Sequence, residues 1–273
     1  MNESHNQRID VPGLSAEEIQ ARVLHRDGLM LVIDKPAGIA VHQGPPNGRD
    51  NGRECLQDNF NALRFGLPRS PSLAHRLDRD TSGCLVLGRH HKALAQLGKL
   101  FKNGAIDKVY WGVVEGSPEA DEGTIDLPLG RLDVTRGWWM KHDPNGQPAV
   151  TKWRVMGRSG DARGSASPLT WLALEPLTGR THQLRVHCAE MGWPILGDPI
   201  YGSAPRTGGP VLHLQAREIV VPLYKNRDPI RVVAPVPEHM RERLTACGWE
   251  AESEATAPRV ISGPEQREGT RNP

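Results

Sequence analysis

Cysteine is scarce in this 273-residue chain, and its four cysteines form no Cys-x-x-Cys pair: Cys55, Cys84, Cys188 and Cys247. This spacing indicates neither a zinc ribbon nor a disulfide framework, so we expect reduced thiols. Long apolar runs are missing too, since none approaches the ~20 residues that a membrane helix needs. The first residues, MNESHNQRIDVPG, lack the apolar core of a signal peptide. We therefore expect a cytoplasmic protein without a membrane partner.

The chain also has little net charge, +2, which is too small to indicate a nucleic-acid partner by itself. The charge is unevenly distributed, however. Between His75 and Lys108 seven Lys or Arg residues accompany three Asp residues, a local excess of four positive charges. This stretch is either a solvated basic face or a strip that contacts phosphate groups, and the charge pattern leaves both interpretations open.

What the chain does contain is ordinary globular composition, with 37% hydrophobic and 24% charged residues. Strand patterns outnumber helix patterns. The periodicity predicts helices from Ser15 to about Leu24, over 92–102, and from Thr181 to Gly192 with Leu184, Cys188 and Met191 on one face. It predicts strands over 29–33, 108–116 and 169–177, a strand or a bend after Gly38, and short strands over 129–157. Because helices and strands do not alternate strictly, we expect an α+β fold with a mixed, mainly antiparallel central sheet.

Two aspartates, each beside an arginine, precede the apolar segment of AHRLDRDTSGCLVL: Asp78 and Asp80. Both could be turn or cap residues. The Asp-x-Asp-x-Thr signature of aspartate-nucleophile phosphotransferases is rejected, because that signature ends a buried apolar strand whereas SPSLAHRL is polar. Alternatively, one aspartate is a nucleophile or base that a distant arginine keeps ionised, for which Arg180 and Arg185 are candidates.

Six stretches in the same order resemble the RluA-type pseudouridine synthases, over about Val23 to Leu244. HRLDRDTSG resembles the central motif of that family, whose catalytic aspartate corresponds to Asp78. KVYWGVVEG places Tyr110 at the active-site tyrosine, and GQPAVTKWRV resembles the Pro-Ala-x-Thr strand. LEPLTGRTHQLRVHCAEMGWPILGDPIYG matches the long third motif and places Arg185 at the basic residue that pairs with the aspartate. VLHLQAREI and APVPEHM resemble the closing strand and the C-terminal stretch.

The resemblance implies a pseudouridine synthase fold whose catalytic cleft crosses the sheet. It implies an N-terminal extension over 1–18, a catalytic domain over 19–249 and a flexible tail over 250–273. Asp78, Tyr110 and Arg185 would be catalytic, while Asp80 would be structural. Arg76 would fill the gap left by a flipped uridine. Together with Arg76, the residues expected to bind RNA are His75, Leu77, Arg79, Arg180 and Leu184.

The implied activity is isomerisation of uridine in RNA, which needs no cofactor. We expect no metal, because His182 and His187 are five residues apart and a helix turns them about 140° from each other. We expect a monomer whose partner is RNA. The compact members of this family act on large-subunit ribosomal RNA, on the tRNA anticodon stem-loop, or on both. A catalytically silent RNA-binding or folding factor is the alternative, but the triad of Asp78, Tyr110 and Arg185 favours an enzyme.

Overall fold

The computed structural model describes residues 14–43, 54–133, 139–160, 168–251 and 261–262. Most of the expected N-terminal extension and most of the expected tail lie outside these residues. The helices are α1 (Ala16–Ala21), the 3₁₀ helix η1 (Leu56–Leu63), α2 (His91–Lys102), α3 (Gln183–Glu190) and α4 (Glu238–Ala246). No helix in this part of the chain is long and apolar enough to cross a membrane.

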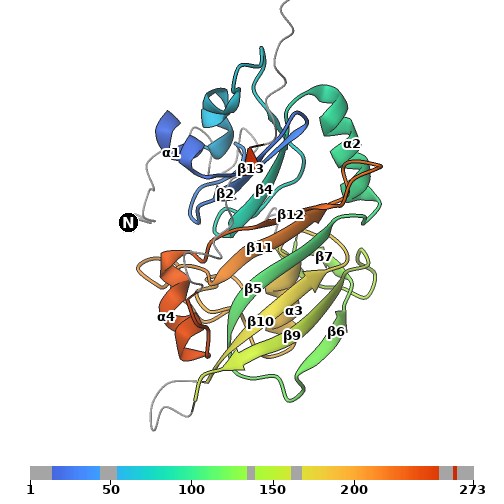
Figure 1. Ribbon diagram of the computed structural model, residues 1–273. Coiled ribbons are helices and arrows are strands. Elements are labelled where there is room, and N and C mark those ends of the chain that lie inside the picture. The colour runs from blue at the N-terminus through green and yellow to red at the C-terminus, as the bar shows by residue number, and fades with distance from the viewer. Residues whose placement is uncertain (1–13, 44–53, 134–138, 161–167, 252–260, 263–273) are drawn as a thin grey trace, which may run out of the picture.

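The strands are β1 (Val23–Arg26), β2 (Met30–Lys35), β3 (Ser72–Leu73), β4 (Ser82–Gly88), β5 (Asp107–Glu115), β6 (Glu122–Asp126), β7 (Leu129–Arg131), β8 (Met140–His142), β9 (Val150–Arg158), β10 (Leu169–Pro176), β11 (Leu214–Val221), β12 (Ile230–Val233) and β13 (Ile261–Ser262). The main sheet has the order β13-β1-β2-β4-β11-β5-β10-β9-β6, with β12 beside β11 and β3 beside β4 (Figure 1). Only β1–β13 and β4–β11 pair in parallel among the described strands of this sheet. The predicted α+β fold with a mixed, mainly antiparallel sheet is confirmed.

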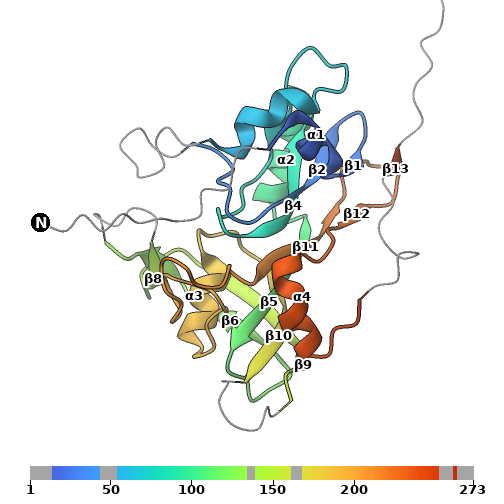
Figure 2. The same cartoon turned by 90° about the vertical axis from the view of Figure 1, so that its left-hand side faces the viewer.

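Helices cover both faces of this sheet, which explains the unbroken apolar run in β4. Leu85 and Leu87 pack with α1 and η1 on one face, whereas Cys84 and Val86 pack with Leu97 of α2 on the other. The second half of the sheet is arranged in the same way. Its β5 and β10 lie between α3 and α4 (Figure 2). The apolar segment that follows the two aspartates is therefore a fully buried strand.

The two halves of the sheet meet at β4 and β11, where the parallel ladder pairs Gln215 with Ser82 and Ala216 with Gly83. Gly83 has φ +101°, and a Cβ on it would overlap the backbone carbonyl of Ala216. Only glycine combines this conformation with this close approach. The last residue of HRLDRDTSG is therefore fixed by backbone contact at the junction, a few residues after Asp78.

Several helix boundaries differ from the prediction. Ser15 caps α1 as expected, with a capping box to Glu18, but the chain continues after Ala21 as strand β1. Helix α3 begins after His182, not at Thr181, and ends at Glu190. Met191, expected on one face with Leu184 and Cys188, is 45% exposed, whereas those two residues are buried. The segment after Gly38 forms no strand and is a bend.

The C-terminal region shows one further difference. Residues Ile261 and Ser262, which fall within the expected flexible tail, pair in parallel with His25 and Arg26 of β1. This short pairing extends the sheet beyond β1, at the edge opposite β6.

Candidate active site

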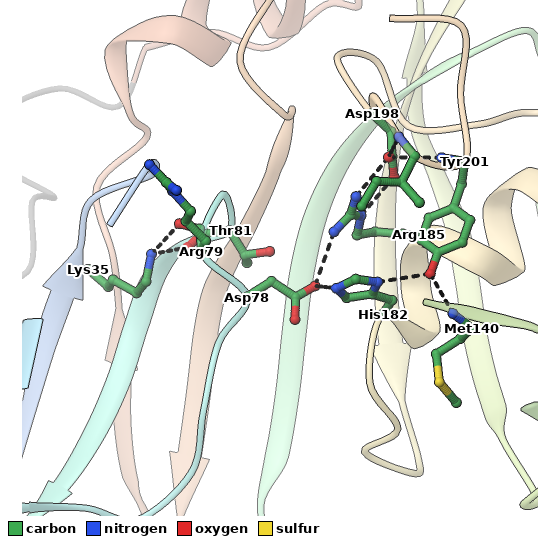
Figure 3. A network of polar contacts seen from close by, with 10 residues as sticks. Lys35, Asp78, Arg79, Thr81, Met140, His182, Arg185, Asp198 and Tyr201 are labelled. Carbon is green, nitrogen blue, oxygen red and sulfur yellow. Dashed lines mark hydrogen bonds and ion pairs between the residues drawn. The ribbon is translucent and has the colours of Figure 1, made fainter. Parts of the chain in front are cut away.

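Asp78 lies in a tight turn that a buried lysine holds immediately before β4. The turn closes through a hydrogen bond from Thr81 N to Asp78 O of 3.2 Å. Lys35 has no exposed surface, and its Nζ donates to the carbonyl oxygens of Arg79, at 2.8 Å, and Thr81, at 2.9 Å (Figure 3). Burial lowers the pKa of Lys35 to about 7, against the charges of Asp80 and, less strongly, Asp78. This environment supports the expected structural role of Asp80.

Arg185 approaches Asp78 as expected, but a second carboxylate binds it more tightly. Its Nη1 lies 3.6 Å from Asp78 Oδ2. Its Nε and Nη2 donate to the two oxygens of Asp198, at 2.7 and 2.8 Å. The Asp198 side chain is fully buried and also accepts hydrogen bonds from the amides of Ile200 and Tyr201. Asp198 was missed from the sequence, because the third motif paired Arg185 with Asp78 alone.

These contacts keep Arg185 and Asp198 charged. Burial alone would lower the pKa of Arg185, but the hydrogen bonds and charge of Asp198, with the charge of Asp78, raise it. Burial would raise the pKa of Asp198, yet the bonds from Arg185 and from two amides lower it. Arg185 is therefore a permanent cation, held closely by one carboxylate and loosely by Asp78.

His182 is a second neighbour of Asp78, and sequence reasoning considered it only as a metal ligand. Its Nε2 lies 3.8 Å from Asp78 Oδ2, and its Nδ1 lies 2.8 Å from the hydroxyl of Tyr201. That hydroxyl accepts a hydrogen bond of 2.9 Å from Met140 N. Burial lowers the pKa of His182 more than the charge of Asp78 raises it. The ring is therefore neutral at neutral pH.

Tyr110 completes this group. It lies on strand β5, which β11 separates from β4 in the sheet. Its backbone pairs with Leu174 of β10 and Ala216 of β11, so that it lies in the middle of the sheet. Burial and then the negative charge of Asp78 raise the pKa of the Tyr110 hydroxyl. The structure thus brings together the three expected catalytic residues, with the phenol of Tyr110 close enough to Asp78 for that side chain to raise its pKa.

The arginines expected to bind RNA differ in how far they reach solvent. Arg76 is exposed, and its Nη1 lies 3.0 Å from Nε2 of His42. Arg180 is exposed and donates to the carbonyl of Pro148 at 3.0 Å. Arg79 is half-buried, and its Nε donates to a carbonyl of the neighbouring loop. Arg76 and Arg180 are therefore more accessible to an RNA phosphate than Arg79 is.

The other three residues expected to bind RNA have their side chains in packing positions. The His75 ring stacks on Phe101 at 4.6 Å between centroids and accepts a hydrogen bond from Val86 N. Burial lowers the pKa of His75 to about 3. Leu77 and Leu184 are buried in two core clusters. These contacts make the three residues supports of the site and do not favour direct contact with RNA.

The histidines of the long third motif do not converge on a metal site. His187 lies within hydrogen-bonding distance of Thr151 Oγ1, at 2.9 Å, and of the Leu127 carbonyl, at 3.1 Å. Both nitrogens of its ring are therefore engaged in packing α3 against β9. In the described ranges, no group of three or more His, Cys, Asp or Glu residues could hold a metal ion.

Comparisons with known proteins identify the family of this chain. The family model described as RNA pseudouridylate synthase matches residues 29–190. An uncharacterized RNA pseudouridine synthase of Zymomonas mobilis is 41% identical, over 80% of this chain and 94% of that protein. Ribosomal large subunit pseudouridine synthase C of Vibrio cholerae is 31% identical, over 84% of this chain and 70% of that protein. Human RNA pseudouridylate synthase domain containing 4 superposes with a TM-score of 0.68 at 26% identity, covering 87% of this chain and 97% of that structure. The chain therefore belongs to the RNA pseudouridylate synthase family, within its RluA type, and is an RNA-modifying isomerase.

Proposed function

We propose that this enzyme isomerises specific uridines in structured RNA and that Asp78 is the residue that starts the reaction. The observation that carries the proposal is the carboxylate of Asp78, which is 28% exposed and therefore accessible, between the buried side chains of Arg185 and His182. A carboxylate that is accessible on one side and flanked by donors on the other is poised to meet a substrate. The Vibrio cholerae relative is named for the large ribosomal subunit, which favours ribosomal RNA over the tRNA anticodon stem-loop.

The chemistry balances without an external group. The bond from N1 to C1′ breaks, the base turns, and C5 forms a new bond to C1′. C5 then loses a proton and N1 gains one, so nothing is oxidised or reduced. Asp78 acts either as a nucleophile at C1′ or as a base at C2′, and both roles need the ionised form that Arg185 supports.

Tyr110 and the exposed arginines provide the contacts for such a substrate. A uridine inside a helix must leave its stack before a carboxylate can reach its sugar. Arg76, exposed beside the turn of Asp78, is placed to fill the gap that the base leaves. Tyr110 would lie against the flipped base and is the candidate group for the C5 proton.

Replacing Asp78 by Asn tests the proposal, because it keeps the shape of the side chain and removes its charge. We expect cells that carry only this variant to lack the pseudouridines that depend on the wild-type gene, while RNA affinity is largely kept, since phosphate contacts dominate affinity. The measurement is a transcriptome-wide pseudouridine map, compared with wild-type cells and cells without the gene. Asp80→Asn in the same turn is the matched control, and we expect it to lower stability more than turnover.

Three results would contradict the proposal. Appreciable turnover by Asp78→Asn would remove Asp78 as the catalyst, and a folded but inactive Asp80→Asn protein would show that the other aspartate acts. If deletion of the gene changed no pseudouridine position although the protein still bound RNA, the silent RNA-binding factor would be the better account. The buried charges of Arg185 and Asp198 argue against that alternative, because a protein that only binds RNA does not need them.

A further inference from the structure

His182 and Tyr201 form a chain of polar contacts that begins at the backbone of β8 and ends at Asp78 (Figure 3). We propose that both are positioning residues, which orient the Asp78 carboxylate through one neutral N–H donor whose direction Tyr201 sets. The inference rests on the proposed role of Asp78 as the residue that starts the reaction. It adds two residues that the reaction scheme above does not use.

The direction of each hydrogen bond follows from its donors. Met140 N is a backbone amide and can only donate, so the Tyr201 oxygen accepts at 2.9 Å. Burial raises the pKa of Tyr201 to about 12, so its hydroxyl keeps a proton. That proton is free to be donated to His182 Nδ1, which lies at 2.8 Å. The proposal assigns this proton to the bond with Nδ1, which makes Nδ1 the acceptor nitrogen of the ring.

This arrangement selects one tautomer of His182. A neutral imidazole carries one proton, and when Nδ1 accepts, the proton is on Nε2. Nε2 lies 3.8 Å from Asp78 Oδ2 and is therefore the donor that faces the carboxylate. The distance is longer than a hydrogen bond, as catalytic contacts often are before substrate binds. A small rotation of Asp78 would close it.

The backbone of His182 supports a positioning role. Its φ is +53°, and in the part of the chain that the structure describes only Phe65 is another non-glycine residue at positive φ. Such a conformation is costly and persists where neighbouring structure enforces it. Here the next residue, Gln183, is anchored by bonds to Thr151 Oγ1, at 3.0 Å, and from Thr178 Oγ1, at 2.7 Å. This backbone conformation places the His182 ring immediately before α3, near both Tyr201 and Asp78.

A neutral donor has an advantage over a second cation at this place. Arg185 already supplies positive charge to Asp78, and it shares that charge with Asp198. A second full charge would stabilise the carboxylate further and weaken it as a nucleophile or base. A neutral N–H from His182 fixes the direction of Oδ2 and leaves the negative charge available.

The test combines spectroscopy of the resting protein with kinetics of variants. In wild type, we expect nitrogen-15 spectra of histidine-labelled protein to show His182 protonated at Nε2 and unprotonated at Nδ1. Tyr201→Phe should change this signature. It should also lower the single-turnover rate on a substrate RNA about 5- to 10-fold, the value of one hydrogen bond, with the Kd for RNA unchanged. His182→Asn, which tolerates positive φ, should lower the same rate at least as much.

Tyr224→Phe is the matched control, because Tyr224 lies beside Arg227 and away from the Asp78 network. It should change neither the rate nor the His182 signature. The proposal is overturned if wild-type His182 is protonated at Nδ1, or if Tyr201→Phe changes the signature and keeps the wild-type rate. Unfolding curves for each variant separate a rate loss from a loss of folded protein. If wild-type protein modifies no RNA, the proposed function fails, while the spectrum still reports whether the chain of hydrogen bonds exists.

Discussion

The buried pair of Arg185 and Asp198 allows a sharp prediction, because each side chain depends on the other for charge balance. Asp198→Asn keeps the volume and removes the charge, leaving a guanidinium that is 3% exposed without its bidentate partner. Breaking a buried pair from one side costs about 3 to 5 kcal/mol of unfolding free energy. For a chain of this size that corresponds to a decrease in Tm of about 6 to 20 °C. Arg185→Met should cost a similar amount, since it leaves Asp198 charged and buried.

The double variant distinguishes pairing from two independent losses. With both charges removed, neither partner is left unbalanced, so we expect the double variant to be more stable than the sum of the single variants by about 1 to 3 kcal/mol. Urea unfolding followed by circular dichroism measures all four proteins. Additivity within about 0.5 kcal/mol would refute the pairing.

Activity should follow a different order from stability. Arg185→Met should lose turnover severely, because Asp78 then has no cation beside it. Arg185→Lys keeps the charge but loses the planar fork and should lie between Arg185→Met and wild type. The assay is the single-turnover rate at a temperature at which every variant is folded. A near-normal rate for Arg185→Met would show that Asp78 does not depend on this cation.

Two further predictions concern stability. Gly83→Ala should lower the free energy of unfolding by about 2 to 5 kcal/mol, since it combines a strained φ with overlap on Ala216. Gly98→Ala on the exposed face of α2 should raise the free energy of unfolding by about 0.5 to 1 kcal/mol. Equal effects of the two variants in urea unfolding would contradict the close approach of Gly83 to Ala216. Burial first, with the nearby His239 and Arg243, lowers the pKa of His213 to about 4. Below pH 6.5, His213 therefore binds a proton in the unfolded chain but stays neutral in the folded protein, so the free energy of unfolding should fall by about 3 kcal/mol on reaching pH 4. If His213→Asn showed the same pH dependence of stability as wild type, this prediction would be refuted.

The sequence predicted what depends on one residue and its immediate neighbours in the chain. The apolar runs predicted the strands, and the family motifs predicted that Asp78, Tyr110 and Arg185 gather at one place. The expectations failed where tertiary contacts determine the secondary structure. Val23 falls within the expected helix, but it pairs with Ile33 of β2, and sheet pairing overrides a weak helical preference.

Asp198 and His182 were missed for a different reason. Asp198 lies in the quoted third motif, yet a sequence gives no measure of which charge is fully desolvated and requires a partner. His182 was judged by its helical spacing from His187, and that argument failed because His182 precedes the helix at positive φ. Burial and backbone conformation were needed to assign both. His75, Leu77 and Leu184 show the converse, since the motif pattern alone does not distinguish residues that support a site from residues that touch a substrate.

The parallel junction of β4 and β11 has a consequence for how the protein is made. Cys84 Sγ contacts the carbonyl of Arg217, which lies 133 residues later. At about 5 to 20 residues per second, the ribosome needs about 7 to 27 s to synthesise that interval. During this time the start of β4 has a buried-strand sequence but lacks the neighbour that will cover its edge, and an open apolar edge invites pairing with other chains. The protein is thus most vulnerable to misassembly while it is still attached to the ribosome.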